Sequence, residues 1–434
     1  MNLVGRIVTA FAALTFVVHG QTDEYEQAPI RYSTTKANDP VAAWQKRFEE
    51  KSLAFDHSSE RAFLKSVLDE LNVPVESQVL VYSKTSLQIS HISPRRPRAI
   101  YFSDEAYVGW VQGGALEIIS FDPKLGPIFY KLTVPDPKST RPPRVVRSRD
   151  CLGCHGGSRT SNVPGMLVRS VRSDIRGFPL LATGTFLTEP SSPIKERWGG
   201  WYVTGTNGGE RHMGNLIFNE ELDDRNNARV INDMGSELTD LTGVIDTKGY
   251  LQDTSDIVAL MVMEHQIAAH NALTRAAFTT RKMLHRQQEL ARYWNEPNRS
   301  MSETTKRVIE SQANQLLRVF LFKDEFQLES WGVEGSEEFQ TAFLKQAKVD
   351  SAGRSLRDFN LLSRLFKHRL SYMIHSTSFK NLPKEIKSVF LQKLEEMLQA
   401  PKAHELSEHL SEKEAARIQH ILRESNVLPG TPST

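Results

Sequence analysis

The chain has 434 residues, of which 39% are hydrophobic and 24% are charged. This composition is typical of a globular protein with a sizeable core, and the length predicts two or three domains. The formal net charge of only +2 gives no case for a nucleic-acid partner, so we expect none.

The first twenty residues are predicted to be a Sec-type signal peptide. Arg6 supplies a positive charge, and the run from Ile7 to Val18 is apolar or small. Cleavage is expected after Val18-His19-Gly20. The run is about twelve residues long, whereas a membrane span needs roughly twenty; an uncleaved anchor is the alternative. We therefore expect a bacterial protein that is periplasmic or secreted, with no membrane span after cleavage.

Residues 21–135 are predicted to form an N-terminal α+β domain. Residues 21–58 are polar and have the composition of a leader or linker, and a helix follows from Ser59 to Leu71. We expect this helix to pack on an antiparallel sheet. The predicted strands are Val79–Tyr82, Leu87–Ile92, Ala99–Phe102, Tyr107–Val111, Leu116–Phe121 and Ile128–Leu132.

Residues 136–252 are predicted to form a β-rich middle domain. A proline-rich connector, Pro135 to Pro143, leads into it. The predicted strands are Met166–Val171, Pro179–Phe186, Trp201–Thr206 and Arg211–Phe218, and Asn207-Gly208 is a strong hairpin signal between the last two.

Residues 253–434 are predicted to form an all-helical C-terminal domain, because the apolar period changes to 3.6. Helices are expected from a Ser255 cap to about Trp294, from Ser302 to about Phe322, in part of 354–376, from Pro383, and after a capping box at Ser411 and Glu414. The predicted fold class is α+β, and it is not a small helical cytochrome c fold.

The chain contains only two cysteines, and both lie in Cys151-Leu152-Gly153-Cys154-His155. In a CxxCH segment each thiol can add to one vinyl group of haem, and the adjacent histidine is then held under the iron. The sequence therefore predicts one covalent haem c on Cys151 and Cys154, with His155 as the proximal iron ligand.

The two cysteines have three other interpretations. A CxxC redox pair usually opens a helix, but Gly156-Gly157 follows here at once. A structural zinc site needs four ligands, and no second CxxC or HxxxH is present. A surface disulfide is the third alternative, and haem c is favoured over all three.

Two arginines just before the motif, Arg147 and Arg149, are candidates for contacts with the haem propionates. A solvated basic loop is the alternative interpretation of this segment.

The residue on the other side of the iron is less directly indicated. His212 is the first candidate, because it follows the Asn207-Gly208 turn, where a strand would present it, and Gly214 would permit close approach of a flat macrocycle. A surface histidine of the hairpin is the alternative. His265, on the long helix, is the reserve candidate, with a core histidine as its alternative. Met166, close to the motif, is a third.

The pentapeptide resembles the haem attachment site of c-type cytochromes. Further runs resemble those of long, exported bacterial proteins with a single CxxCH. This resemblance implies haem binding and an extracytoplasmic location, and it adds no substrate. The runs are Tyr101-Phe102-Ser103-Asp104-Glu105, Arg197-Trp198-Gly199-Gly200-Trp201-Tyr202-Val203-Thr204-Gly205, Arg211-His212-Met213-Gly214-Asn215, Met263-Glu264-His265-Gln266 and Ser355-Leu356-Arg357-Asp358-Phe359.

The predicted function is single-electron transfer by a periplasmic mono-haem c-type cytochrome, in preference to catalysis. Its redox partner proteins are not indicated by the sequence. The alternatives are a haem-based gas or redox sensor and a haem enzyme of the peroxidase type. An enzyme of the peroxidase type usually needs an open sixth position on the iron and a second haem or a radical site.

Overall fold

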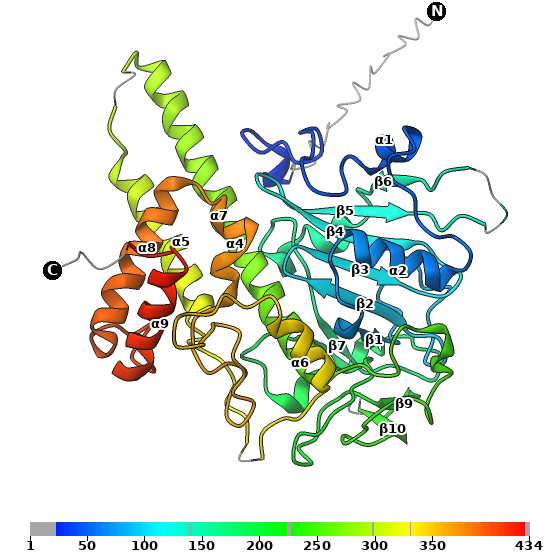
Figure 1. Ribbon diagram of the computed structural model, residues 1–434. Helices are drawn as coiled ribbons and strands as arrows, with labels where there is room; N and C mark the ends of the chain where they lie inside the picture. The colour runs from blue at the N-terminus through cyan, green and yellow to red at the C-terminus, as the bar shows by residue number, and fades with distance from the viewer. Residues whose placement is uncertain are drawn as a thin grey trace, which may run out of the picture.

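The computed structural model describes residues 23–136, 138, 141–223, 227–296, 299–329 and 331–429. The predicted signal peptide, residues 1–20, lies outside the described residues. The predicted α+β class is confirmed: an antiparallel sheet region precedes a helical region along the chain (Figure 1).

The main sheet is an antiparallel meander in which each strand pairs with the next one along the chain. Its strands are β1 (Val79–Val81), β2 (Arg98–Ser103), β3 (Ala106–Trp110), β4 (Leu116–Asp122), β5 (Gly126–Leu132) and β6 (Val145–Arg147). The predicted strand at Leu87–Ile92 is wrong. The Gln88 side chain hydrogen bonds both the N–H and the C=O of Ala115 there, and Leu87 and Ile89 are exposed.

Helix α2 (Glu60–Glu70) covers one face of this sheet (Figure 1). Ser59 caps the helix, because its Oγ accepts a hydrogen bond from the N–H of Ala62 at 3.1 Å. Phe63 and Val67 are fully buried on the side that faces the strands. The predicted helix and its packing on the sheet are both confirmed.

The two faces of the sheet belong to different parts of the core, because side chains alternate along each strand. Tyr101 and Val108 lie in the cluster with α2. Phe102, Tyr107 and Phe121 point to the other face and pack with α4 of the helical region. The sheet is thus buried on both sides.

Residues 23–58 are not the linker that their polar composition predicts. They contain the short helix α1 (Trp44–Glu49), and Trp44 and Phe48 are buried in the core below α2. The rings of Trp44 and Phe55 lie edge to face with 5.2 Å between their centroids. A few aromatic anchors therefore fix a segment that is otherwise polar.

The middle region has short strands and much irregular backbone. β7 (Arg169–Val171) pairs with β8 (Thr185–Leu187), and β9 (Leu216–Leu222) pairs with β10 (Ala228–Asp233). The predicted hairpin around Asn207-Gly208 does not form. The segment before it pairs elsewhere, through bridges from Trp201 to Val81 and from Thr206 to Glu334, and the segment after it runs into β9, which pairs with β10.

Long helices dominate the C-terminal region: α4 (Ile257–Tyr293), α5 (Glu303–Phe320), α6 (Glu337–Leu344), α7 (Thr377–Lys380), α8 (Lys384–Gln399) and α9 (Glu412–Glu424). The predicted cap Ser411 is confirmed, and Ser302, where the second helix was predicted to begin, is the N-cap of α5. Helix α4 is capped by Asp256 rather than Ser255, whose hydroxyl donates to the carbonyl of Tyr202 instead.

The third predicted helix, within 354–376, is mostly irregular backbone. A bridge between Phe359 and Phe366 turns the chain back on itself, and a single 3-10 turn, Tyr372–His375, follows. The aromatic side chains of this segment, such as Phe359 and Phe366, therefore pack around a loop.

Pairing and packing cross both predicted domain boundaries. β6 lies after residue 135 yet pairs with β5 before it. Helix α4 lies after residue 252 yet shares one hydrophobic cluster with the sheet. Within the described residues, no helix combines the length and apolar character that crossing a membrane requires.

Candidate functional site

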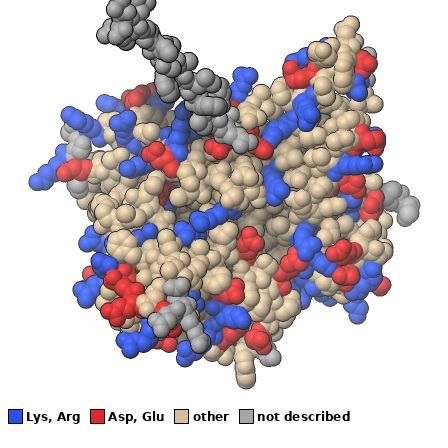
Figure 2. Space-filling view, turned by 180° about the vertical axis from the view of Figure 1, so that it is seen from behind, with Lys and Arg blue, Asp and Glu red and all other residues tan. Residues whose placement is uncertain are grey.

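A cavity of about 340 Å³ lies between the face of the sheet turned away from α2, the CxxCH segment and helix α4. Its volume is in the range of ligand pockets. Figure 2 looks at the molecule from the side opposite to Figure 1, where acidic and basic side chains are interspersed among uncharged ones. Apolar lining residues include Ile100, Tyr107, Ile119, Phe129, Val168, Trp201, Met263 and Ile267.

The CxxCH segment forms a single helical turn at one wall of this cavity. Helix α3 (Leu152–His155) follows Cys151, whose carbonyl accepts hydrogen bonds from the N–H groups of Cys154 and His155. Residues three and four apart lie on the same side of a helix. Both sulfurs and the imidazole consequently belong to residues that line one cavity.

The ring of His155 is held through its Nδ1 atom. Nδ1 lies 2.8 Å from the carbonyl oxygen of Gly165, and the N–H of Gly165 donates back to the carbonyl of His155. Burial lowers the pKa of His155, so the ring is neutral at neutral pH. An Nδ1–H donated to a carbonyl leaves the lone pair on Nε2, which is the arrangement of a metal-ligating histidine.

Helix α4 holds the loop that carries Gly165. The Asn271 side chain accepts from the N–H of Met166 at 2.9 Å and donates to its carbonyl at 2.8 Å. Through this clamp, the position of His155 is tied to α4.

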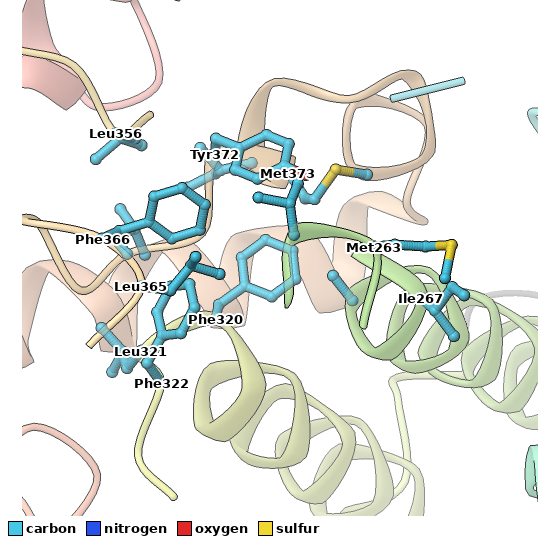
Figure 3. Packing of buried hydrophobic residues seen from close by; sticks show 14 of the residues in the cluster. Met263, Ile267, Phe320, Leu321, Phe322, Leu356, Leu365, Phe366, Tyr372 and Met373 are labelled. Carbon is cyan, nitrogen blue, oxygen red and sulfur yellow. The ribbon is translucent and has the colours of Figure 1, made fainter. Parts of the chain in front are cut away.

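Met263 and Ile267 of α4 form the wall of the cavity that faces the sheet. They are four residues apart and so lie on one side of the helix. Figure 3 shows both apart from the aromatic cluster that includes Phe322, Phe366 and Tyr372. Met166 also lines the cavity, so two thioethers besides the two thiols are present there.

The charged side chains of the cavity suit a ligand with carboxylates. Lys84, Arg98 and Arg169 line it, and the buried Nε of Arg169 has no hydrogen-bond partner. Arg98 is paired with Glu117. The ammonium of Lys84 lies over the Phe178 ring and Arg169 donates to Thr185 Oγ1, so among the described residues these two cations of the lining have no carboxylate partner. A largely apolar cavity with two thiols, a neutral imidazole and two cations that no carboxylate neutralises fits haem, which is flat, apolar and carries two propionates.

Arg147 and Arg149, the predicted propionate contacts, do not line this cavity. Arg147 donates to the carbonyls of Tyr32 and Thr35 and lies over the Tyr32 ring, and Arg149 donates to the carbonyl of Ser33. Both arginines fasten the N-terminal segment beside α3, so the structure gives them another role.

His212, the predicted distal ligand, is also placed outside the cavity. It lies before β9 in irregular backbone, because the predicted strand around it does not form. Its ring packs edge to face on Trp198 with 5.3 Å between the centroids, and burial lowers its pKa to about 4. Trp201, in contrast, lines the cavity.

His265, the reserve candidate, faces the helical core. It is two residues beyond Met263, which is about 200° around the helix, so it points away from the cavity that Met263 lines. Its Nε2 lies 2.7 Å from Ser371 Oγ, and its ring stacks on Phe322. This is the core histidine that the sequence left as the alternative.

We expect His265 to make the protein less stable in mild acid. Burial lowers its pKa from 6.5 to about 3, so below pH 6.5 the unfolded chain takes up a proton that the folded chain does not. Stability from this residue is complete above pH 6.5 and is lost as the pH falls towards 3. When the pH is lowered from 7 to 5, the free energy of unfolding measured in urea should fall by about 2 kcal/mol less for His265→Phe than for wild type. Equal losses would contradict the prediction.

Structural zinc needs four converging ligands. Within the part of the chain that the structure describes, no group of three or more His, Cys, Asp or Glu side chains is arranged to hold a metal ion. Cys151 and Cys154 are not joined by a disulfide.

No protein family, no curated protein and no solved structure matches this chain in a comparison of sequences and folds. The functional inference consequently depends on the site itself.

Several residues of the cavity were not predicted from the sequence, namely Lys84, Arg98, Glu117, Arg169 and Met263. Met263 lies in the run Met263-Glu264-His265-Gln266, and this was the only feature of the sequence that drew attention to it. The charged residues come from separate strands and loops, and only the register of the sheet brings them together.

Proposed function

We propose that the protein is a mono-haem c-type cytochrome that transfers single electrons outside the cytoplasm. The observation that carries the proposal is that Cys151, Cys154 and His155 line one apolar cavity, with the Nδ1 of His155 held by a carbonyl. Haem bound there would supply an iron that accepts and releases one electron.

The residues of the chain would have distinct tasks at this site. Cys151 and Cys154 would form the thioethers, and His155 would bind the iron through Nε2. Lys84 and Arg169 would pair with the propionates. The walls formed by Phe129, Trp201, Met263 and others would exclude water, and exclusion of water from a haem helps to set its reduction potential.

The proposal is tested on the full chain exported from a host that attaches haem c. Haem should remain with the chain in a denaturing gel, at one haem per chain. A low-spin six-coordinate absorption spectrum that carbon monoxide does not change would support electron transfer. A high-spin spectrum that shifts with carbon monoxide or peroxide would contradict electron transfer in favour of sensing or catalysis.

We predict that Met263 provides the sixth ligand, because it and Met166 are the thioether side chains of the cavity lining, and Met166 follows Gly165 at the back of His155. A change of Met263→Ala should convert the spectrum to high spin and make it sensitive to carbon monoxide. Met166→Ala, His212→Ala and His265→Ala serve as matched controls that should remain low spin. A low-spin spectrum in Met263→Ala would refute the assignment.

A further inference from the structure

An arginine and a glutamate form an ion pair on the floor of the cavity. Arg98 Nη2 of β2 lies 2.5 Å from Glu117 Oε2 of β4, and the two side chains are only 21% and 20% exposed. Ser86 Oγ donates to the same carboxylate. Both charged residues line the cavity that His155 lines.

The sheet is built to hold this pair across an intervening strand. Gly109 of β3 lies between them, paired with Ile100 on one side and with Glu117 on the other. A Cβ at Gly109 would collide with the guanidinium of Arg98. The missing side chain of Gly109 is therefore the space through which Arg98 reaches from β2 to β4.

The pair lines the same cavity as Cys151, Cys154 and His155, so its two charges face the space in which those residues would hold haem. The other charged side chains of the cavity lining are Lys84, Asp150 and Arg169.

We propose that Arg98 and Glu117 shift the reduction potential of the haem in opposite directions, with Arg98 raising it and Glu117 lowering it, so that the intact pair keeps the two effects balanced. The inference rests on the proposed haem function. Reduction lowers the charge on the iron by one, so a nearby cation stabilises the reduced state and a nearby anion stabilises the oxidised state. Coulomb interactions weaken with distance and with solvent, so a half-buried pair beside the proximal ligand acts more strongly than pairs on the surface.

Because the two charges are opposite in sign, removing each one should shift the midpoint potential in the opposite direction, and this can be measured. Glu117→Gln leaves Arg98 unbalanced and should raise the midpoint potential above that of wild type. Arg98→Met leaves Glu117 unbalanced and should lower it. The double variant should return close to the wild-type value, and Arg98→Lys, which keeps the charge, should do the same. A residue with only a structural role would not produce shifts of opposite sign that cancel.

A matched control pair is available on the other face of the sheet. Arg47 of α1 and Glu70 of α2 form an ion pair at 2.6 Å with side chains 36% and 30% exposed, and neither residue lines the cavity. Arg47→Met and Glu70→Gln remove the same charges and should leave the potential unchanged.

The measurement is a spectroelectrochemical titration of the full chain at one pH and ionic strength, made only on preparations that carry covalent haem. A wild-type chain without haem would contradict the proposed function itself. Haem-loaded Glu117→Gln and Arg98→Met variants with the same potential, or with shifts in the same direction, would overturn the proposal while leaving haem binding intact.

Discussion

Replacing both Cys151 and Cys154 with alanine should abolish covalent haem in the exported protein. The two residues are the only cysteines of the chain, so no other side chain can form a thioether. Each single variant leaves one thiol at the cavity and should retain haem by one bond at a reduced yield. The readouts are haem staining after denaturing electrophoresis and the mass of the intact chain.

A control is needed because a chain that loses haem can also be degraded. His155→Ala keeps both thiols and should retain covalent haem while the spectrum loses its proximal ligand. Haem that stays attached in the double cysteine variant would refute the site, and loss of haem in every variant would point to failed maturation.

The second large effect is expected at a buried ion pair beside the cavity wall. Glu264 is fully buried, and its carboxylate accepts from Arg197 Nη1 at 2.8 Å and from Trp198 Nε1 at 2.6 Å. Arg197→Met would leave a buried carboxylate without its cation, and such changes cost about 3–5 kcal/mol. Urea unfolding at neutral pH should show this loss.

Two comparisons make this stability prediction specific. Lys306→Met, in the exposed Glu303–Lys306 pair of α5, should change the free energy of unfolding by less than about 1 kcal/mol. The double change Arg197→Met with Glu264→Leu should recover much of the loss, because no charge remains buried. A loss below about 1 kcal/mol in Arg197→Met alone would contradict the prediction.

Short sequence patterns correctly predicted the helix starts and strands that depend only on neighbouring residues. Ser59, Ser302 and Ser411 are followed by apolar residues at helical spacing, and each caps a helix. The predicted strands Leu116–Phe121 and Ile128–Leu132 likewise correspond to β4 and β5. In these segments the sequence within one or two turns of the chain was enough.

The same rules failed where distant segments compete for the backbone. Asn207-Gly208 is a good hairpin turn, yet Thr206 pairs with Glu334 and Trp201 with Val81. Such pairing depends on parts of the chain more than 100 residues apart, which no local pattern contains. The prediction of a linker before residue 59 failed for a related reason. A polar average composition does not show that a few large aromatic residues anchor the segment in the core.

The site was predictable in its covalent part and not in its surroundings. The CxxCH spacing alone located Cys151, Cys154 and His155. On α4 nearly every residue from Ile257 to His270 is buried, so the apolar pattern did not show which side faces the cavity. That is why His265 was a candidate and Met263 was not.

The runs that carry the resemblance are joined to one another in space. Arg197 and Trp198 bind Glu264, and Arg357 forms an ion pair with Asp104. Each of these polar contacts therefore connects two of those runs that lie far apart in the sequence.

The two hydrogen bonds between Asn271 and Met166 connect the C-terminal half of the chain to the site. Helix α4 closes the cavity with Met263 and Ile267, and through Asn271 it also fixes the loop behind His155. Since α5 and α8 pack this helix into the hydrophobic core, the C-terminal half acts as a scaffold for one wall of the cavity. A chain cut before Ile257 would keep both thiols but expose the floor of the cavity to water.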